Sequence, residues 1–250
     1  MAKNKTKKII HAGPLVIEAV YPRATSRDSA KARSAKRKMS SEAQQRMNAI
    51  YSWQKLELLL AANFLPGDLV VCFTYDDAHL PSKRQQAEDR LKYFRKQLTA
   101  ARRKAGQDLV MFWSTEHKHG DGRWHHHCVI NSTGEDYELI RSLWIYGIDV
   151  EIKPLRLDAE KNYATLARYM CKEERDKLGQ RSWSYTRNAR KPEVETFRVE
   201  DDTTVQVPKG AVELRSSSER TEYGSYRVIK YLAPGWDRMP RPKAKRRRKR

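Results

Sequence analysis

The sequence of 250 residues predicts an α+β fold, in which a ferredoxin-like (split β-α-β) antiparallel sheet carries helices on one face and basic disordered tails extend at both ends. Two observations predict this class. Strand-like and helix-like segments follow one another in the order strand, helix, strand, strand, helix, strand, helix. Hydrophobic residues make up 39% of the chain, which allows a core, whereas charged residues make up 33% and give a very polar surface.

The first predicted elements are a leader helix, a strand and a second helix. Apolar residues recur at helical spacing over 41–63, and Pro66 and Gly67 end this pattern. The run LVVCFTY over 69–75 is rich in β-branched and aromatic residues, which predicts a buried strand. A polar helix with an apolar stripe follows over 82–104.

Two further strands are predicted to form a hairpin. The segments LVMFWST (109–115) and RWHHHCVIN (123–131) are strand-like, and the glycine-rich KHGDG lies between them, so we expect antiparallel pairing. A short helix, an alternating strand and a last helix complete the order, over 136–144, 148–155 and 158–174.

Composition predicts four parts of the chain. Residues 1–40 carry +9 and residues 239–250 carry +8 of the total charge of +20, which leaves +3 for all the others. We expect a basic flexible N-terminal arm, a domain with the leader helix, a β-rich extension with strands near 194–207 and 226–232, and a basic tail, with the boundaries 1–40, 41–192, 193–238 and 239–250.

The basic ends indicate a polyanionic partner, because cationic arms gain affinity by releasing condensed counterions. Nucleic acid is therefore the leading partner, although residues 239–250 could also be a solubility tail or a localisation signal. No membrane partner is expected, because no segment approaches the roughly 18 apolar residues of a span. Three widely spaced cysteines without a Cys-x-x-Cys motif argue against a disulfide framework and indicate a reducing compartment.

Three consecutive histidines lie in the predicted strand 123–131. Side chains alternate along a strand, so His125 and His127 share one face and His126 points the other way. Two imidazoles on one face can bind a metal ion, and Glu116 on the partner strand offers an oxygen that Mn²⁺ or Mg²⁺ favours. The three histidines could instead form an exposed basic patch. A second His-x-His at 117–119 lies in the predicted turn and is the weaker candidate.

The last predicted helix contains NYATLARYMCKEER. Tyr169 and Lys172 are three residues apart and share a helix face, whereas Tyr163 lies about 120° round the axis from Tyr169. A tyrosine phenolate can displace the 3′ oxygen of a phosphodiester, which leaves a covalent phosphotyrosine and a free 3′-OH. A neighbouring ammonium stabilises the phenolate or the charge of the transition state.

These segments resemble the HUH endonucleases, in particular the single-tyrosine rolling-circle replication initiators (Rep proteins) of bacterial plasmids, phages and integrative elements. LVVCFTYDD resembles the first motif strand of that family, and STEHKHGDGRWHHHCVIN resembles its glutamate and histidine motif. LARYMCKE resembles the tyrosine helix, and RSWSYTRNARKP resembles a segment that follows it. The similarity covers about 41–192, and the histidine strand and the tyrosine helix are its specific parts.

The resemblance implies an HUH/Rep-type domain with a divalent metal cofactor, Mn²⁺ or Mg²⁺. It implies His125 and His127 as metal ligands and Glu116 as the third ligand. It further implies Tyr169 as the nucleophile and Lys172 as its helper. The family has a hydrophobic residue between the two histidines, so a shifted register that uses the middle histidine stays open as an alternative.

The resemblance also implies single-stranded DNA at a replication origin as the partner, in the cytoplasm of a bacterial host cell. Aromatic and basic residues after the tyrosine helix suit base stacking and phosphate binding, although an ordinary surface loop has the same composition. These residues are Arg181, Trp183, Tyr185, Arg187 and Lys191. The sequence has no GxxxxGK[ST] phosphate loop, so we expect a separate helicase or supercoiling to unwind the DNA.

Other functions remain open at this stage. A relaxase or a single-tyrosine transposase would use the same chemistry, but a histidine strand that precedes the tyrosine helix favours an initiator. A non-catalytic nucleic-acid-binding module could use the same sheet, although no RNP-type motif is present. A metal-dependent nuclease with water as nucleophile would cleave without a covalent adduct.

Overall fold

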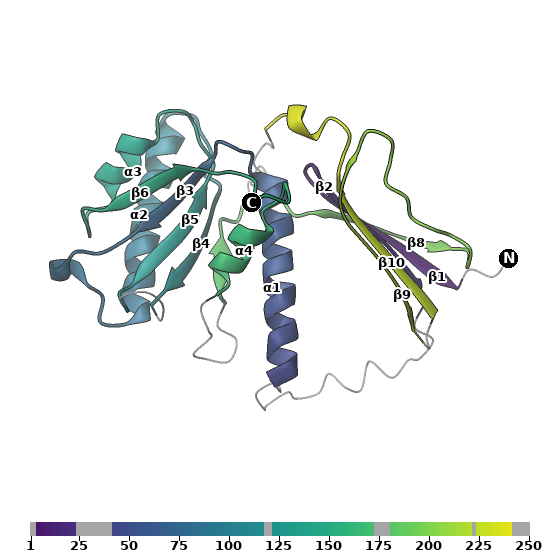
Figure 1. Cartoon of the computed structure of the whole chain (residues 1–250). Helices are drawn as coiled ribbons and strands as arrows, with labels where there is room; N and C mark the ends of the chain where they lie inside the picture. Colours follow the sequence, from purple (N-terminus) through teal and green to yellow (C-terminus); the bar gives the residue numbers. More distant parts are fainter. Residues whose placement is uncertain (1–3, 24–41, 118–121, 173–180, 222–223, 242–250) are drawn as a thin grey trace, which may run out of the picture. The chain divides into compact units, whose positions relative to one another are not determined.

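In the computed structural model of the chain, two compact units each contain a five-stranded antiparallel sheet (Figure 1). No helix of the described ranges is both long and apolar enough to cross a membrane. The structure describes residues 4–23, 42–117, 122–172, 181–221 and 224–241. One unit consists of 1–48 with 191–240, and the other consists of 49–190 with 241–250.

The unit over 49–190 has the predicted ferredoxin-like order. Its strands are β3 (Leu69–Phe73), β4 (Met111–Glu116), β5 (His125–Ile130), β6 (Val150–Pro154) and β7 (Trp183–Tyr185). Its helices are α1 (Glu42–Asn63), which begins in the other unit, α2 (Arg84–Lys104), α3 (Tyr137–Leu143) and α4 (Ala164–Met170). The spatial strand order is β6-β3-β5-β4-β7, with every neighbouring pair antiparallel. The chain order β3-α2-β4-β5-α3-β6 therefore confirms the split β-α-β prediction.

Different helices cover the two faces of this sheet. On one face α2 and α3 enclose the main core, in which the Phe73 ring lies 4.6 Å from the rings of both Phe94 and Trp144. On the opposite face Phe112 packs against Phe64, just after α1, and against Tyr185 of β7, with ring centroids 5.3 and 5.1 Å apart. The expectation of helices on one face is therefore wrong for α1 and α4, which lie on this second face of the sheet (Figure 1).

Residues 5–22 form two strands, so the prediction of a flexible arm over 1–40 is wrong for this part. β1 (Lys5–Ala12) and β2 (Leu15–Pro22) form a hairpin, and Val16 and Val20 of β2 are buried beside Ile229. The other strands of this sheet are β8 (Glu193–Val199), β9 (Val212–Thr221) and β10 (Gly224–Leu232), in the order β8-β1-β2-β10-β9. The predicted β-rich extension therefore supplies three of the five strands of a sheet that the hairpin completes. The remainder of the arm, 24–40, and the tail from 242 lie outside the described residues.

The last helix of the ferredoxin-like unit is shorter than the pattern predicts. α4 begins at Ala164, because the segment before it forms a turn around Asp158. The Asp158 carboxylate accepts hydrogen bonds from the backbone N–H groups of Glu160 and Asn162, at 3.1 and 3.0 Å. Lys161 has a positive φ of 56°, which is incompatible with a right-handed helix.

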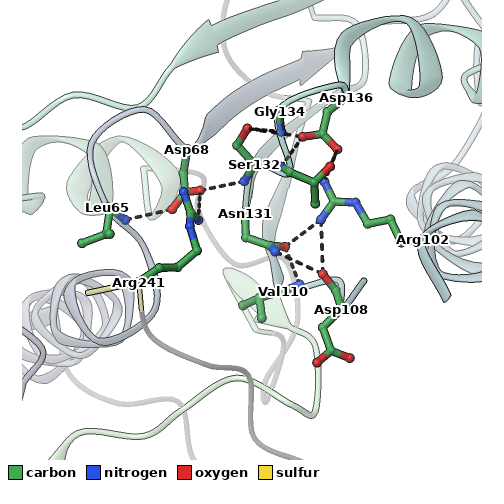
Figure 2. A network of polar contacts seen from close by, with 11 residues as sticks. Leu65, Asp68, Arg102, Asp108, Val110, Asn131, Ser132, Gly134, Asp136 and Arg241 are labelled. Carbon is green, nitrogen blue, oxygen red and sulfur yellow. Dashed lines mark hydrogen bonds and ion pairs between the residues drawn. The ribbon is translucent and has the colours of Figure 1, made fainter. Parts of the chain in front are cut away.

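A network of buried polar groups joins the strand ends opposite the histidine pair (Figure 2). The Arg102 guanidinium of α2 is fully buried and donates to Asp136 at 2.7 Å and to Asn131 at 2.8 Å. Asn131 also accepts the N–H of Val110 at 2.7 Å, which ties the start of β4 to the end of β5. Beside it, the buried Asp68 carboxylate accepts N–H groups of Leu65 and Ser132 and pairs with Arg241.

Asp136→Asn removes the charge that compensates the buried Arg102 guanidinium. We expect the free energy of unfolding to fall by about 3–5 kcal/mol, because breaking a buried ion pair leaves an uncompensated charge. Urea denaturation measures this loss. Glu138→Gln is the control, since its contact with Arg141 is exposed and 3.4 Å long, and it should change stability by less than about 0.5 kcal/mol. An equal loss in both variants would contradict the assignment.

The same pair predicts a pH dependence. Burial alone would raise the pKa of Asp136, but hydrogen bonds from Thr133 and the charge of Arg102 lower this pKa below its usual value. Its stabilisation is therefore present above the unfolded pKa of about 3.9 and is lost as the pH falls through the lower folded pKa. The stability difference between the wild type and Asp136→Asn should shrink between about pH 7 and about pH 3. Urea unfolding at each pH measures it, and a constant difference would refute the linkage.

Candidate active site

The β4–β5 hairpin places Glu116 and two of the histidines on one face of the sheet. In the antiparallel register Glu116 pairs with His125, and Ser114 pairs with His127. Paired residues of neighbouring strands point to the same face, and residues two apart on one strand do so as well. Glu116, His125 and His127 therefore share the face on which α4 lies. The His127 Nε2 atom is 2.7 Å from Glu116 Oε2.

Helix α4 adds Tyr169 and Lys172 to the same place. The Tyr169 hydroxyl lies 3.2 Å from His127 Nε2, and the two ring centroids are 4.8 Å apart. The Lys172 ammonium lies 2.8 Å from Glu116 Oε1 and 3.9 Å from the centre of the Tyr169 ring. Each of these four side chains contacts at least two of the others, so they form one connected set, which we call the Tyr169 cluster.

Contacts with α1 fix the position of α4. The Arg168 guanidinium lies 4.4 Å above the Trp53 ring, a cation–π contact between the two helices. Ser52 of α1 accepts the Trp183 indole N–H at 3.0 Å and lies 3.9 Å from the Cys171 sulfur. Because Cys171 lies between Tyr169 and Lys172 in sequence, these contacts orient the end of the helix that carries both residues.

The electrostatics of the Tyr169 cluster follow from partial burial. Burial alone would raise the pKa of Glu116, but its hydrogen bonds from Lys172 and His127 lower it. Burial lowers the pKa of His127, although Glu116 acts in the opposite direction. Burial would lower the pKa of Lys172, but its hydrogen bonds to Glu116 and Tyr169 raise it. Near neutral pH the cluster therefore contains a carboxylate, a neutral imidazole and an ammonium.

The middle histidine points into the core on the α2 side of the sheet. His126 has no exposed surface, and its two ring nitrogens lie 2.7 Å from the Tyr75 hydroxyl and 3.0 Å from the Thr115 hydroxyl. Burial lowers its pKa to about 3, so it is neutral. The register thus places His126 away from Glu116, and His125 and His127 are the pair that shares its face.

The donor set fits a divalent cation in part. The Glu116 carboxylate and the neutral His127 imidazole converge, and this combination of oxygen and nitrogen suits Mn²⁺ or Mg²⁺. His125 is half-buried on the same face. Among the described residues, however, no three His, Cys, Asp or Glu side chains lie in an arrangement that would hold an ion as they stand. The ring of His117, in the alternative pair, stacks on Trp124 with centroids 4.3 Å apart, and position 119 is outside the described residues.

The two tyrosines of the last helical segment differ in accessibility. The Tyr169 side chain is 44% exposed, whereas Tyr163 is 4% exposed. The Tyr163 hydroxyl is buried without a hydrogen-bond partner in the described part of the chain, and burial raises its pKa far above the usual value. Of the two, only Tyr169 can reach a substrate.

The residues expected to bind DNA do not form one surface. Trp183 and Tyr185 of β7 are half-buried on the face of the Tyr169 cluster, where Tyr185 stacks on Phe112. Arg187 is exposed and lies close enough to Arg95 of α2 to lower its pKa, which places it toward the other face. Arg181 is exposed, and Lys191 belongs to the other unit.

The prediction from sequence missed one neighbour of the histidine pair. Cys72 of β3 pairs with His127 on one side and with Glu151 of β6 on the other, so the three residues form one row across the sheet. Burial, followed by the charges of Glu151 and Glu116, raises the Cys72 pKa to about 11, so the thiol stays protonated. Alternation in LVVCF could have placed Cys72 opposite the buried Val71 and Phe73, but its neighbours depend on strand order.

Residues 68–174 match the profile of a family described as replication-associated proteins of the ORF2 type. This match supports a Rep-type replication protein. The matched segment includes β3 and α4, and with them every residue of the Tyr169 cluster, but it covers less than half of the chain. No curated protein and no solved structure matches this chain.

Proposed function

We propose that this protein is a replication initiator that nicks and rejoins single-stranded DNA at an origin through a covalent 5′-phosphotyrosine, and so starts rolling-circle replication. The observation that carries the proposal is the exposed Tyr169 hydroxyl, 3.2 Å from His127 Nε2, in one cluster with Glu116 and Lys172. The match to a replication-associated family over the same residues supports it.

In the nicking step the Tyr169 oxygen attacks the phosphorus and the bond from phosphorus to the 3′ oxygen breaks. The 3′ oxygen leaves with the electron pair and takes up a proton as a free 3′-OH, while the 5′ phosphate stays on Tyr169. Attack of a 3′-OH on this ester reverses the step and rejoins a strand. The chemistry needs no other energy source, because the phosphotyrosine retains the energy of the phosphodiester.

The hydrogen-bond pattern of the cluster determines where the tyrosine proton goes. A carboxylate only accepts hydrogen bonds, so the His127 Nε2–H donates to Glu116 and this nitrogen cannot take up the proton of Tyr169. Tyr169 is 44% exposed, so the proton leaves to solvent water. The Lys172 ammonium beside the ring then stabilises the phenolate and the negative charge of the transition state.

Glu116 and His127, joined by His125 from the same face, would hold a Mn²⁺ or Mg²⁺ ion. Such an ion, when bound, polarises a nonbridging phosphate oxygen and neutralises charge on phosphorus. Lys172 keeps Glu116 oriented toward His127. We further propose that a separate helicase or supercoiling supplies the single strand in the cytoplasm of a bacterial host, since the sequence has no phosphate loop.

The nucleophile can be identified by a covalent adduct. The wild type, incubated with a pool of labelled single-stranded DNA and Mn²⁺, should give a protein–DNA band that survives SDS on a denaturing gel. Tyr169→Phe should remove this band, and Tyr163→Phe should retain it at the wild-type level, because the Tyr163 hydroxyl is buried. Cleavage without an adduct would reject the tyrosine mechanism in favour of a water nucleophile. Tight binding to the native origin without cleavage would favour a non-catalytic module.

Two neighbouring histidines should respond in opposite ways to removal. His127→Leu should weaken Mn²⁺ binding at least tenfold, measured by isothermal titration calorimetry, because it removes one proposed ligand. His126→Leu should leave Mn²⁺ affinity unchanged but reduce the free energy of unfolding by about 1–3 kcal/mol, because the Tyr75 and Thr115 hydroxyls lose a buried partner. Unchanged Mn²⁺ affinity in His127→Leu would exclude this metal site.

A further inference from the structure

The outer surface of α2 carries a shallow positive groove. Its volume is ≈ 680 Å³, and its charged lining consists of four cations and one acid: Lys92, Arg95, Lys96, Arg103 and Asp89. We call these four cations the α2 basic stripe. Successive members lie one to seven residues apart, and all of them face the same groove, so they follow one side of the helix for about three turns.

Most of the charge in the stripe is not neutralised by the protein. Arg84 and Arg102 of the same helix pair with Glu88 and Asp136 at 2.8 and 2.7 Å. In contrast, none of the stripe cations forms an ion pair within the described residues, and three of them, Lys92, Lys96 and Arg103, are exposed. Unpaired like charges along one surface repel one another, and an anionic partner removes this repulsion.

A second pair of cations continues the surface toward the sheet edge. The Arg95 guanidinium lies 4.4 Å above the Trp113 ring, a contact that fixes its position. Burial lowers the pKa of Arg95, and the neighbouring positive charge of Arg187 adds to the effect. Trp113 packs against the core on the α2 side, so these arginines lie on the opposite side of the sheet from Tyr169. The surface is therefore distinct from the Tyr169 cluster.

We infer that the α2 basic stripe binds the phosphate backbone of duplex DNA beside the nicked strand. Eleven residues separate Lys92 from Arg103, which is about 16 Å along a helix and about five phosphates along one strand. Tyr93 is the only aromatic residue of the described groove lining, whereas a surface for a single strand needs several stacking rings. The choice of DNA as the polyanion rests on the proposed function.

A salt titration of DNA binding tests this inference. The test variant combines Lys92→Gln, Lys96→Gln and Arg103→Gln, which are exposed and leave the core intact. A labelled duplex of about 30 base pairs is titrated by fluorescence anisotropy at several NaCl concentrations. Because each phosphate contact contributes about 0.9 to the slope of log K against log salt, the slope should fall in magnitude by about 2.7 for three cations.

A charge-matched control separates this site from general attraction. Lys209→Gln, Arg215→Gln and Arg220→Gln remove three exposed charges from the other unit and should change the slope by less than about 1. Equal effects of the two triple variants would overturn the inference. A larger loss for a single-stranded oligonucleotide than for the duplex would overturn it in favour of single-strand binding.

The adduct assay keeps the two proposals distinguishable. The α2 triple variant should form the Tyr169 adduct on a short single-stranded oligonucleotide at the wild-type rate, since the stripe lies on the other face of the sheet. Absence of an adduct in the wild type would refute the nicking chemistry and leave the duplex titration as an independent result. Loss of the adduct in the triple variant alone would contradict a separate surface.

Discussion

The fixed register between β4 and β5 is the constraint on which the rest of this structure depends. A slip of one residue would move every side chain of β5 to the opposite face, and the histidines would exchange places. Both ends of the hairpin resist such a slip. At one end His126 is held between the hydroxyls of Thr115 and Tyr75, and at the other Asn131 joins the two strands to Arg102.

Buried polar groups are compensated at both ends, but with different consequences. Arg102 and Asp136 are fully enclosed, so their pairing serves the fold and neither reaches solvent. In the Tyr169 cluster the Glu116 side chain is 7% exposed while Lys172 and Tyr169 reach solvent. A carboxylate held between an ammonium and an imidazole keeps its charge at little cost in desolvation. Such a group remains able to exchange its partners for a cation or a phosphate.

One sheet therefore serves two different surfaces. The strand alternation that places His126 in the core also separates the Tyr169 cluster from the α2 basic stripe, so chemistry and duplex binding need not compete for the same side chains. The core between them, built on Phe73, Phe94 and Trp144, is rigid and closely packed. It would keep a duplex on one side in a constant position relative to a strand at Tyr169.

Local patterns in the sequence by themselves determined the order of the ferredoxin-like elements and the shared face of His125 and His127, because helical spacing and strand alternation act over a few residues. Only the tertiary structure decided which groups lie beside them. Cys72 neighbours His127 through strand order, and Tyr169 reaches it because α4 packs on α1. The hairpin over 5–22 is predicted as flexible since its partner strands lie at the other end of the chain. Local periodicity contains no information on such distant pairing.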